Sequence, residues 1–156
     1  EESDKQARIK RMRSDKSILD TVQSDLSLLG VKIGSGDKAR VDEYLQAIRD
    51  ADQIVLGPGS LYTSIMPNLL VEGITKAIRE SRALKVLVCN VATQPGETDG
   101  YSAEDHVAAI NRHVGDDLFQ HLVLHDTTRK AVPTDGAATP VVASARIAAA
   151  RGVSMF

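Results

Sequence analysis

One stretch of the chain decides both the fold and the place to look for a site: Ile54-Val55-Leu56-Gly57-Pro58-Gly59-Ser60-Leu61-Tyr62-Thr63-Ser64. Residues 54–56 are uniformly apolar and β-favouring, which is typical of a strand buried on both faces. The polarity changes within one residue at Gly57, and glycines let the backbone approach a ligand closely. Hydroxyl groups and unpaired amides then gather at the start of the next helix. Such a corner suits an anionic or phosphate-bearing ligand.

Other segments of the chain repeat this order of strand, loop and helix. Strand-like runs occupy residues 86–91, 119–124 and 153–155, in addition to 54–56. Helical patterns occupy residues 14–29, 37–50, 67–78 with a break near Gly73, 102–113 and 143–151. The alternation matches right-handed β-α-β units. We therefore predict an α/β fold with a Rossmann-like, mostly parallel sheet and helices on both faces.

The remaining segments are predicted to be irregular or short. Residues 1–16 carry both signs of charge and are read as an edge strand or a frayed terminus rather than a basic anion patch. Residues 31–33 form a short strand-like piece, and residues 34–37 form a flexible turn in which Asp37 is a candidate cap for the next helix. Residues 126–139 lack periodicity and are predicted to be a loop.

Length and composition limit the classes of protein. The 156 residues are in the single-domain range, and a net charge of −2 with 3% aromatic residues gives no support for a nucleic-acid surface. The lone Cys89 cannot form an internal disulfide, and no signal peptide or membrane-spanning apolar run is found. We expect a cytoplasmic protein that binds neither nucleic acid nor membrane, and the sequence is compatible with a homo-oligomer.

The chain begins at Glu1 rather than at a methionine, and it has fewer strand-like runs than a three-layer α/β domain usually needs. Residues 1–156 are therefore expected to be the carboxyl-terminal part of one α/β domain in a longer protein.

A second polar loop, residues 92–101, follows the run 86–91. In parallel sheets, ligands bind beyond the carboxyl ends of the strands. The loops at 57–64 and 93–101 will therefore lie side by side if their strands are neighbours. Two glycine-bearing polar loops at equivalent positions indicate one shared site.

The familiar catalytic patterns are missing from the first of these loops. Tyr62 stands where a dinucleotide fingerprint has its third glycine, and no Gly-Lys-Ser/Thr follows to bind a nucleoside triphosphate. Ser60 lacks the flanking glycines of a hydrolase nucleophile. We expect Ser60 to hydrogen-bond a ligand or to cap the helix.

Carboxylates in the second loop leave several roles open. Glu97 and Asp99 could orient a sugar hydroxyl, bind Mg²⁺, act as a base, or only cap turns. Tyr101 could stack on a base or a sugar ring or pack the loop, and we favour the ligand. Cys89 is expected to be a buried apolar residue.

The four histidines are spread over one helix and one strand. No cysteine or close histidine pair completes a metal site, so packing or surface roles are expected for His106, His113, His121 and His125. His106 is the exception, because it lies one turn into a helix beside the second loop.

At these two loops the chain resembles the gluconeogenesis factor family, the YvcK-like proteins, which are distantly related to 2-phospho-L-lactate transferase. Two runs carry the resemblance, Ala51–Leu70 and Val88–Tyr101, and it continues through Ser102–Val107. Segment Ser14–Asp37 is longer than the corresponding connection expected in this family. The chain also lacks the glycine-rich amino-terminal loop that opens the family's fold.

The resemblance implies a Rossmann-like fold and binding of a sugar nucleotide, UDP-N-acetylglucosamine, by regulators of carbon metabolism, cell-wall synthesis and cell shape in bacteria. The transferase relatives join a phospholactyl group to a deazaflavin with Mg²⁺. Their first loop usually differs from the one here, and they lack the pattern at residues 93–101. We therefore favour the regulator over a Mg²⁺-dependent phospholactyl transferase.

We predict a non-catalytic site without a resident cofactor or metal. The first loop would hold the diphosphate or its sugar, and the second would hold hydroxyls and base. The expected ligand-binding residues are Gly57, Pro58, Gly59, Ser60, Tyr62, Thr63, Ser64, Asn68, Asn90, Thr93, Gln94, Gly96, Glu97, Thr98, Asp99 and Tyr101. Mg²⁺ enters only under the transferase alternative. A third reading is a structural or partner-binding domain in which both loops only cap helices.

Overall fold

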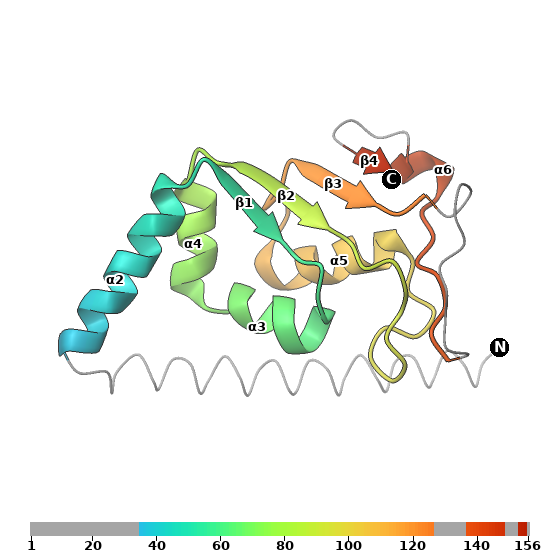
Figure 1. The fold of residues 1–156 in the computed structure, drawn as a ribbon, viewed down its shortest axis with the longest axis horizontal. Helices are drawn as coiled ribbons and strands as arrows, with labels where there is room; N and C mark the ends of the chain where they lie inside the picture. Colours follow the sequence, from blue (N-terminus) through green and yellow to red (C-terminus); the bar gives the residue numbers. More distant parts are fainter. Residues whose placement is uncertain (1–34, 127–136, 149–152, 156) are drawn as a thin grey trace.

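A four-stranded parallel sheet with strand order β1-β2-β3-β4 forms the centre of the computed structural model (Figure 1). The structure describes residues 35–126, 137–148 and 153–155. The strands are β1 (Gln53–Leu56), β2 (Leu84–Val88), β3 (His121–Leu124) and β4 (Val153–Met155). Val55 is in register with Val86, and Leu87 with Leu122. The α/β class and the parallel sheet are therefore confirmed.

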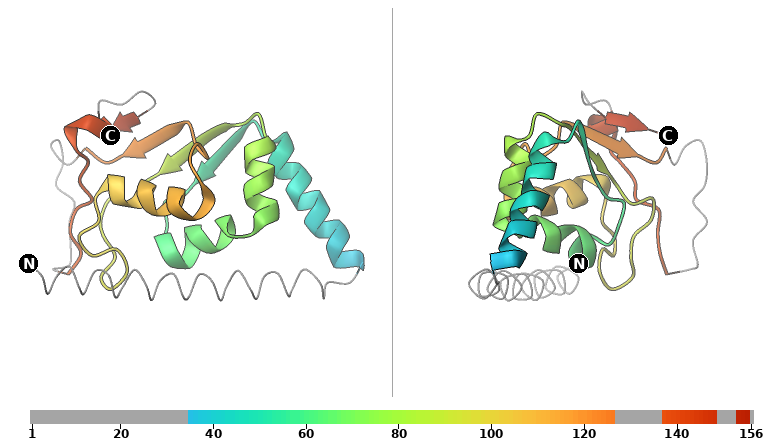
Figure 2. Two further views of the ribbon diagram at one scale, coloured as in Figure 1. Left: turned by 180° about the vertical axis from the view of Figure 1, so that it is seen from behind. Right: turned by 60° about the vertical axis from the view of Figure 1, so that its left-hand side comes forward.

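Helices connect the strands, and those that precede β3 lie to one side of the sheet. They are α2 (Ser35–Asp50), the π-helix η1 (Leu61–Ile65), α3 (Met66–Leu69), α4 (Glu72–Glu80), α5 (Ala103–Val114) and α6 (Ala145–Ala148). Figures 1 and 2 show α3, α4 and α5 on the same side of the sheet, with α2 alongside α4. The Arg49 Nε atom donates to the Glu80 carboxylate at 2.9 Å and fastens the end of α2 to α4. The helices α2 to α5 thus form one layer.

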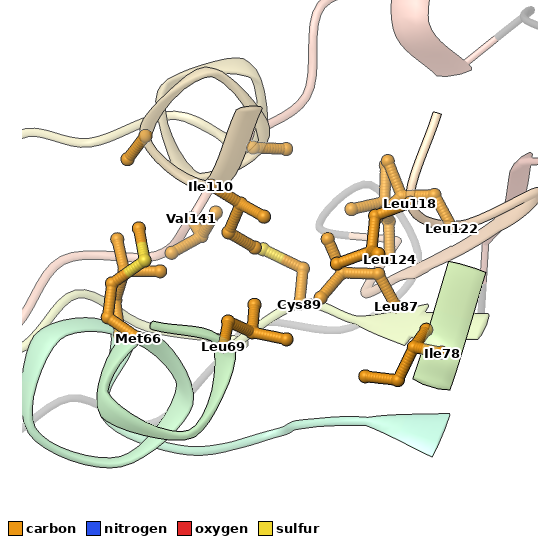
Figure 3. Close-up of a cluster of buried hydrophobic side chains, with 13 residues drawn as sticks. Met66, Leu69, Ile78, Leu87, Cys89, Ile110, Leu118, Leu122, Leu124 and Val141 are labelled. Carbon is orange, nitrogen blue, oxygen red and sulfur yellow. The ribbon is translucent and has the colours of Figure 1, made fainter. Parts of the chain in front are cut away.

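The core lies between that layer and the sheet (Figure 3). Leu87 and Leu122 of the sheet belong to one buried cluster with Ile78 of α4 and Ile110 of α5, and all four are at most 5% exposed. Leucine and isoleucine side chains on alternate strand positions supply this face, as the period of two in a strand requires. This apolar burial is the main favourable contribution to folding.

The opposite face of the sheet is only partly covered within the described residues. Val55 is 54% exposed and Leu84 is 47% exposed. The prediction that residues 54–56 are buried on both faces is therefore wrong, because β1 alternates between inward and outward side chains. Strands placed in sequential order with right-handed connections bring their helices to the same face.

Several element boundaries differ from the sequence-based expectation. Residues 35–37, expected in a turn, belong to α2. The helix predicted over 67–78 breaks at Leu70 and Val71, so Gly73 lies inside α4 instead of at the break. β2 begins at Leu84 and ends at Val88, earlier at both ends than the predicted run 86–91.

Other predicted elements are confirmed. These are the strands around 122–124 and 153–155 and the helix that follows Ser102. The predictions for residues 1–34, most of the loop 126–139 and the end of the last helix lie outside the described residues. Across the described ranges, no helix is long and apolar enough to cross a membrane.

Candidate functional site

The first loop, residues 57–64, and the second loop, residues 93–101, meet at the carboxyl ends of β1 and β2 (Figure 1). Their strands are hydrogen-bonded neighbours, so both chains leave the sheet at the same edge. Side chains of the second loop hydrogen-bond to the first loop directly. The predicted juxtaposition of the two loops is therefore confirmed.

Gly57 makes the close approach possible at the point where β1 ends. It has a φ of 79°, and the Gly57–Pro58 peptide bond is cis. A Cβ atom at this position would lie 2.6 Å from the carbonyl oxygen of Val88. Any side chain would therefore meet both an unfavourable φ and a backbone atom that cannot move aside cheaply.

Asn90 joins the end of β2 to the first loop. The Gly59 amide donates to Asn90 Oδ1 at 3.0 Å, and Asn90 Nδ2 donates to the Gly59 carbonyl at 2.9 Å. The side-chain amide thereby satisfies both backbone groups of Gly59, as a neighbouring strand would. Asn90 thus fixes the position of the first loop relative to the end of β2.

Glu97 reaches from the second loop into the first. Its Oε1 atom accepts a hydrogen bond from the Ser60 hydroxyl at 2.5 Å and another from the Tyr62 amide at 2.7 Å. Hydrogen bonds to a carboxylate are stronger than neutral ones. Two of the donors that the sequence predicts for an anionic ligand are therefore engaged by the protein's own carboxylate.

Ser60 also begins the helical segment after the first loop. Its hydroxyl accepts a hydrogen bond from the Thr63 amide at 3.1 Å and contacts the Thr63 hydroxyl. The predicted capping role of Ser60 is therefore confirmed. The segment starts as the π-helix η1 and continues as α3, with Pro67 in the first turn. Such π-helical turns are frequent at functional sites.

Three aromatic rings form a continuous edge-to-face stack between the loops. The hydroxyls of Tyr62 and Tyr101 are 2.8 Å apart, and the two ring centroids are 6.4 Å apart. The centroid of Tyr101 lies 5.6 Å from that of His106, which is 4% exposed. His106 Nδ1 contacts the carbonyl of Ser102 at 2.8 Å. His106 thus supports the Tyr101 ring from inside the protein.

The second loop is rigidified by its own hydrogen bonds. Thr98 is fully buried, and its hydroxyl accepts from the Gln94 amide at 2.8 Å. Asp99 Oδ2 accepts from the Gly96 amide at 2.9 Å. The loop can therefore present Glu97 at one position without induced ordering.

A strap formed by residues 137–143 closes the base of the second loop. Thr93 is 4% exposed, its amide donates to the Thr139 carbonyl at 2.7 Å, and the two hydroxyls lie 3.1 Å apart. The Val141 amide donates to the Val91 carbonyl at 3.0 Å. Since the Thr93 and Thr98 hydroxyls are engaged inside the protein, both residues contribute to the shape of the loop. The sequence did not predict the strap.

Six of the predicted site residues face outward around the two loops. These exposed positions are Pro58, Thr63, Ser64, Asn68, Gly96 and Asp99. Asn68 Nδ2 donates to the Ser64 carbonyl at 2.7 Å, so it also stabilises the turn. The outer edge of the site thus offers hydroxyl, amide and carboxylate groups.

A groove of about 400 Å³ runs from the first loop along β1 toward α2 and α4. Its polar end is formed by the first loop and Asn68, and its apolar end includes Ile48, Ile74 and Ile78. Tyr44 and Ile48 of α2 also line this groove, and no sequence pattern associated them with the site, because that association depends on how α2 packs beside β1.

The charge of the site is negative. Neither loop contains lysine or arginine, whereas Glu97 and Asp99 both lie in the second loop. No group of three or more candidate metal ligands occurs in the described part of the chain. Cys89 lies just after β2, and burial raises the pKa of its thiol to about 11. Cys89 is therefore a packing residue at neutral pH, as predicted.

The fold and the paired loops define a Rossmann-like α/β protein with a polar site at the ends of two neighbouring parallel strands. The model of the family described as 2-phospho-L-lactate transferase CofD matches residues 7–153. The chain belongs to this CofD family.

Within the family, the chain is similar to proteins named gluconeogenesis factor. It is 49% identical over 121 residues to that of Halalkalibacterium halodurans, an alignment covering 75% of this chain and 38% of the relative. It is 58% identical over 73 residues to that of Bacillus subtilis, covering 47% of this chain and 23% of the relative. The resemblance stated from the two loops is thus confirmed.

Solved structures agree with the fold. A member of the UPF0052 family from Bacillus halodurans matches with a TM-score of 0.63 and 44% identity, over 73% of this chain and 39% of that chain. The chain therefore spans about two fifths or less of the length of these relatives.

Proposed function

We propose that the chain is part of a regulatory protein of the gluconeogenesis factor type that binds a sugar nucleotide, UDP-N-acetylglucosamine, between the first and second loops. The observation that carries this proposal is the hydrogen-bonded contact between two polar loops at the carboxyl ends of neighbouring parallel strands. Ligands of open α/β sheets bind at this position. The names of the similar proteins support a role in carbon metabolism.

Side chains at the outer edge of the loops are suited to a hydroxyl-rich ligand. The Tyr62 and Tyr101 rings offer faces on which a sugar or a base can pack, and their hydroxyls are both donors and acceptors. Ser64, Asn68 and Asp99 add exposed hydrogen-bonding groups. We propose binding without turnover, with no resident cofactor, in the cytoplasm and without nucleic acid or membrane as partner.

Calorimetry tests the binding proposal directly. UDP-N-acetylglucosamine titrated into the protein should give saturable heat, and Tyr101→Ala should weaken the affinity about tenfold, because stacking on an aromatic ring contributes roughly 1–3 kcal/mol. Arg82→Ala is the matched control, since Arg82 is exposed and precedes β2 at the opposite end of the strand. Absence of heat with every sugar nucleotide tried would exclude this function.

The transferase alternative is supported by the description of the matching family model. In that case Glu97 or Asp99 would hold Mg²⁺ or act as a base, and the protein would transfer a nucleotide-activated phospholactyl group. Mass spectrometry of an incubation with Mg²⁺ and candidate substrates would detect the product. If Glu97→Gln and Asp99→Asn retained full activity, those two roles would be excluded.

A homo-oligomer is also part of the proposal. Sedimentation of the protein with and without UDP-N-acetylglucosamine would report the oligomeric state and whether the ligand changes it. A single monomeric species under both conditions would remove this element and leave the binding proposal standing.

A further inference from the structure

We propose that the Glu97 side chain occupies the anion-binding corner of the first loop, and that it positions this loop for the uncharged, hydroxyl-bearing part of the ligand. The ligand's phosphates then lie outside this corner. This inference rests on the proposed function for the identity of the ligand. The occupation of the corner by Glu97 is testable without any ligand.

Glu97 occupies the hydrogen-bond donors that a phosphate oxygen would need. The Ser60 hydroxyl and the Tyr62 amide both point at Glu97 Oε1, at 2.5 and 2.7 Å. The Ser60 hydroxyl in turn accepts from the Thr63 amide at 3.1 Å. A ligand phosphate at this corner would have to displace a half-buried carboxylate from these donors, and it would gain only similar hydrogen bonds.

The loop that carries Glu97 is held in place by contacts that do not involve the first loop. Thr98, the next residue, is fully buried and bonded to Gln94 through both its hydroxyl and its amide. Thr93 is fastened to the strap through Thr139. Withdrawal of Glu97 would strain this buried network. Glu97 therefore acts as a fixed support of the first loop, which we call the brace, and it is not displaced by a ligand.

The charge of the two loops also favours the sugar over the diphosphate at this corner. The two loops contain no lysine or arginine, and a diphosphate placed beside Glu97 and Asp99 would face like charges. An uncharged sugar avoids this repulsion, and carboxylates are good acceptors for its hydroxyls. Cationic groups that neutralise the diphosphate must come from outside the two loops.

Amide hydrogen exchange of Tyr62, followed by NMR, tests the brace. In Glu97→Ala the Tyr62 amide should exchange about 10–100 times faster, the equivalent of one lost hydrogen bond to a charged group. Added acetate should restore protection by filling the vacated position. In Glu97→Gln the exchange rate should lie between those of the wild type and Glu97→Ala, because the amide oxygen can still accept both bonds but carries no charge. Asp99→Asn, two residues along the same loop, is the matched control and should leave Tyr62 unchanged.

A titration of the unmodified protein removes any dependence on how the variants fold. Pyrophosphate should leave the Ser60 and Tyr62 amide resonances unshifted, whereas N-acetylglucosamine should shift the ring resonances of Tyr101. Pyrophosphate shifts at Ser60 and Tyr62, or unchanged Tyr62 protection in Glu97→Ala, would overturn the inference. If calorimetry finds no sugar-nucleotide binding while the exchange pattern holds, the proposed function fails and the brace stands.

Discussion

Gly57 is the residue on which the meeting of the two loops depends most directly. Gly57→Ala should lower the free energy of unfolding by about 2–4 kcal/mol, because the new methyl group combines an unfavourable φ with a backbone clash. Gly96→Ala is the control, since Gly96 has a φ of 81° but no atom lies within 4 Å of the point where its Cβ would be. It should cost only about 1–2 kcal/mol.

Urea denaturation of the three proteins would measure both differences. Equal destabilisation of the two variants would mean that the contact with the Val88 carbonyl carries no extra cost, and the tight junction between β1 and β2 would lose its explanation.

Cys89 gives the protein a defined pH dependence. Burial raises the pKa of its thiol to about 11, whereas an unfolded cysteine titrates near its ordinary value. The unfolded state therefore releases this proton first. The resulting stability is fully present below the unfolded pKa and is lost as the pH rises through the folded one.

Wild type should consequently lose about 1–2 kcal/mol more stability than Cys89→Ala between about pH 8 and about pH 10. Denaturation curves at both pH values would give this difference, and comparison of the two proteins cancels the titration of tyrosines and lysines. Parallel losses in both proteins would contradict the assignment.

Helix α5 is the element whose start is most fully specified by its sequence. The Ser102 hydroxyl accepts from the Asp105 amide at 3.2 Å, and the Ser102 amide donates to the Asp105 carboxylate at 3.0 Å. These two hydrogen bonds form a reciprocal capping box, in which Asp105 stands in place of the more usual glutamate. Ser102→Ala should therefore lower the free energy of unfolding by about 1 kcal/mol, and Ser102→Thr should lower it by about a few tenths of a kcal/mol or less.

Thermal unfolding followed by circular dichroism would compare the two variants. Because Ala103 and His106 are buried in the same turn, fraying should also expose the support of Tyr101. A Ser102→Ala protein as stable as the wild type would show that the tertiary contacts of α5 override its cap.

Local signals and tertiary contacts explain which elements could be predicted. The apolar run before Gly57, the cap at Ser102 and the approximate position of β3 follow from patterns within a few residues. Ser35 and Gly36 are typical of a turn by residue type, yet they belong to α2. The apolar residues Cys89 and Val91 led to the prediction that β2 continues to residue 91. This predicted end is wrong, because the strand ends at Val88 and the Asn90 side chain bonds to Gly59 instead.

The site was predictable as a location but not as a set of contacts. Polar loops after two apolar runs predicted the shared edge of the sheet. The bond between Ser60 and Glu97 spans 37 residues, and it depends on strand order and on the shape of the second loop. No local pattern distinguishes a glutamate that binds a ligand from one that takes the ligand's place.

Among the residues that the structure describes, the stability of the fold depends on the apolar layer between the sheet and the helices. Leu87 is 2% exposed at the centre of that layer, and Leu84 of the same strand is 47% exposed. Leu87→Ala should destabilise the protein by about 2–5 kcal/mol, because it leaves a cavity. Leu84→Ala should cost less than about 1 kcal/mol, because little apolar area is lost from a buried environment.

Denaturant titration of both variants would separate the covered from the exposed part of the sheet. A large loss of stability in Leu84→Ala would mean that this side chain is covered in solution. A small cost at both positions would contradict the assignment of the core.

Thr93 and its partner Thr139 are separated by 46 positions along the chain. During synthesis the strands β1 and β2 leave the ribosome well before the strap does, because the chain is made from its amino terminus. The second loop is therefore synthesised before the strap that stabilises it. A nascent chain that ends before residue 137 would carry both loops without their final shape, so the candidate site should reach its final geometry only after the strap has been translated.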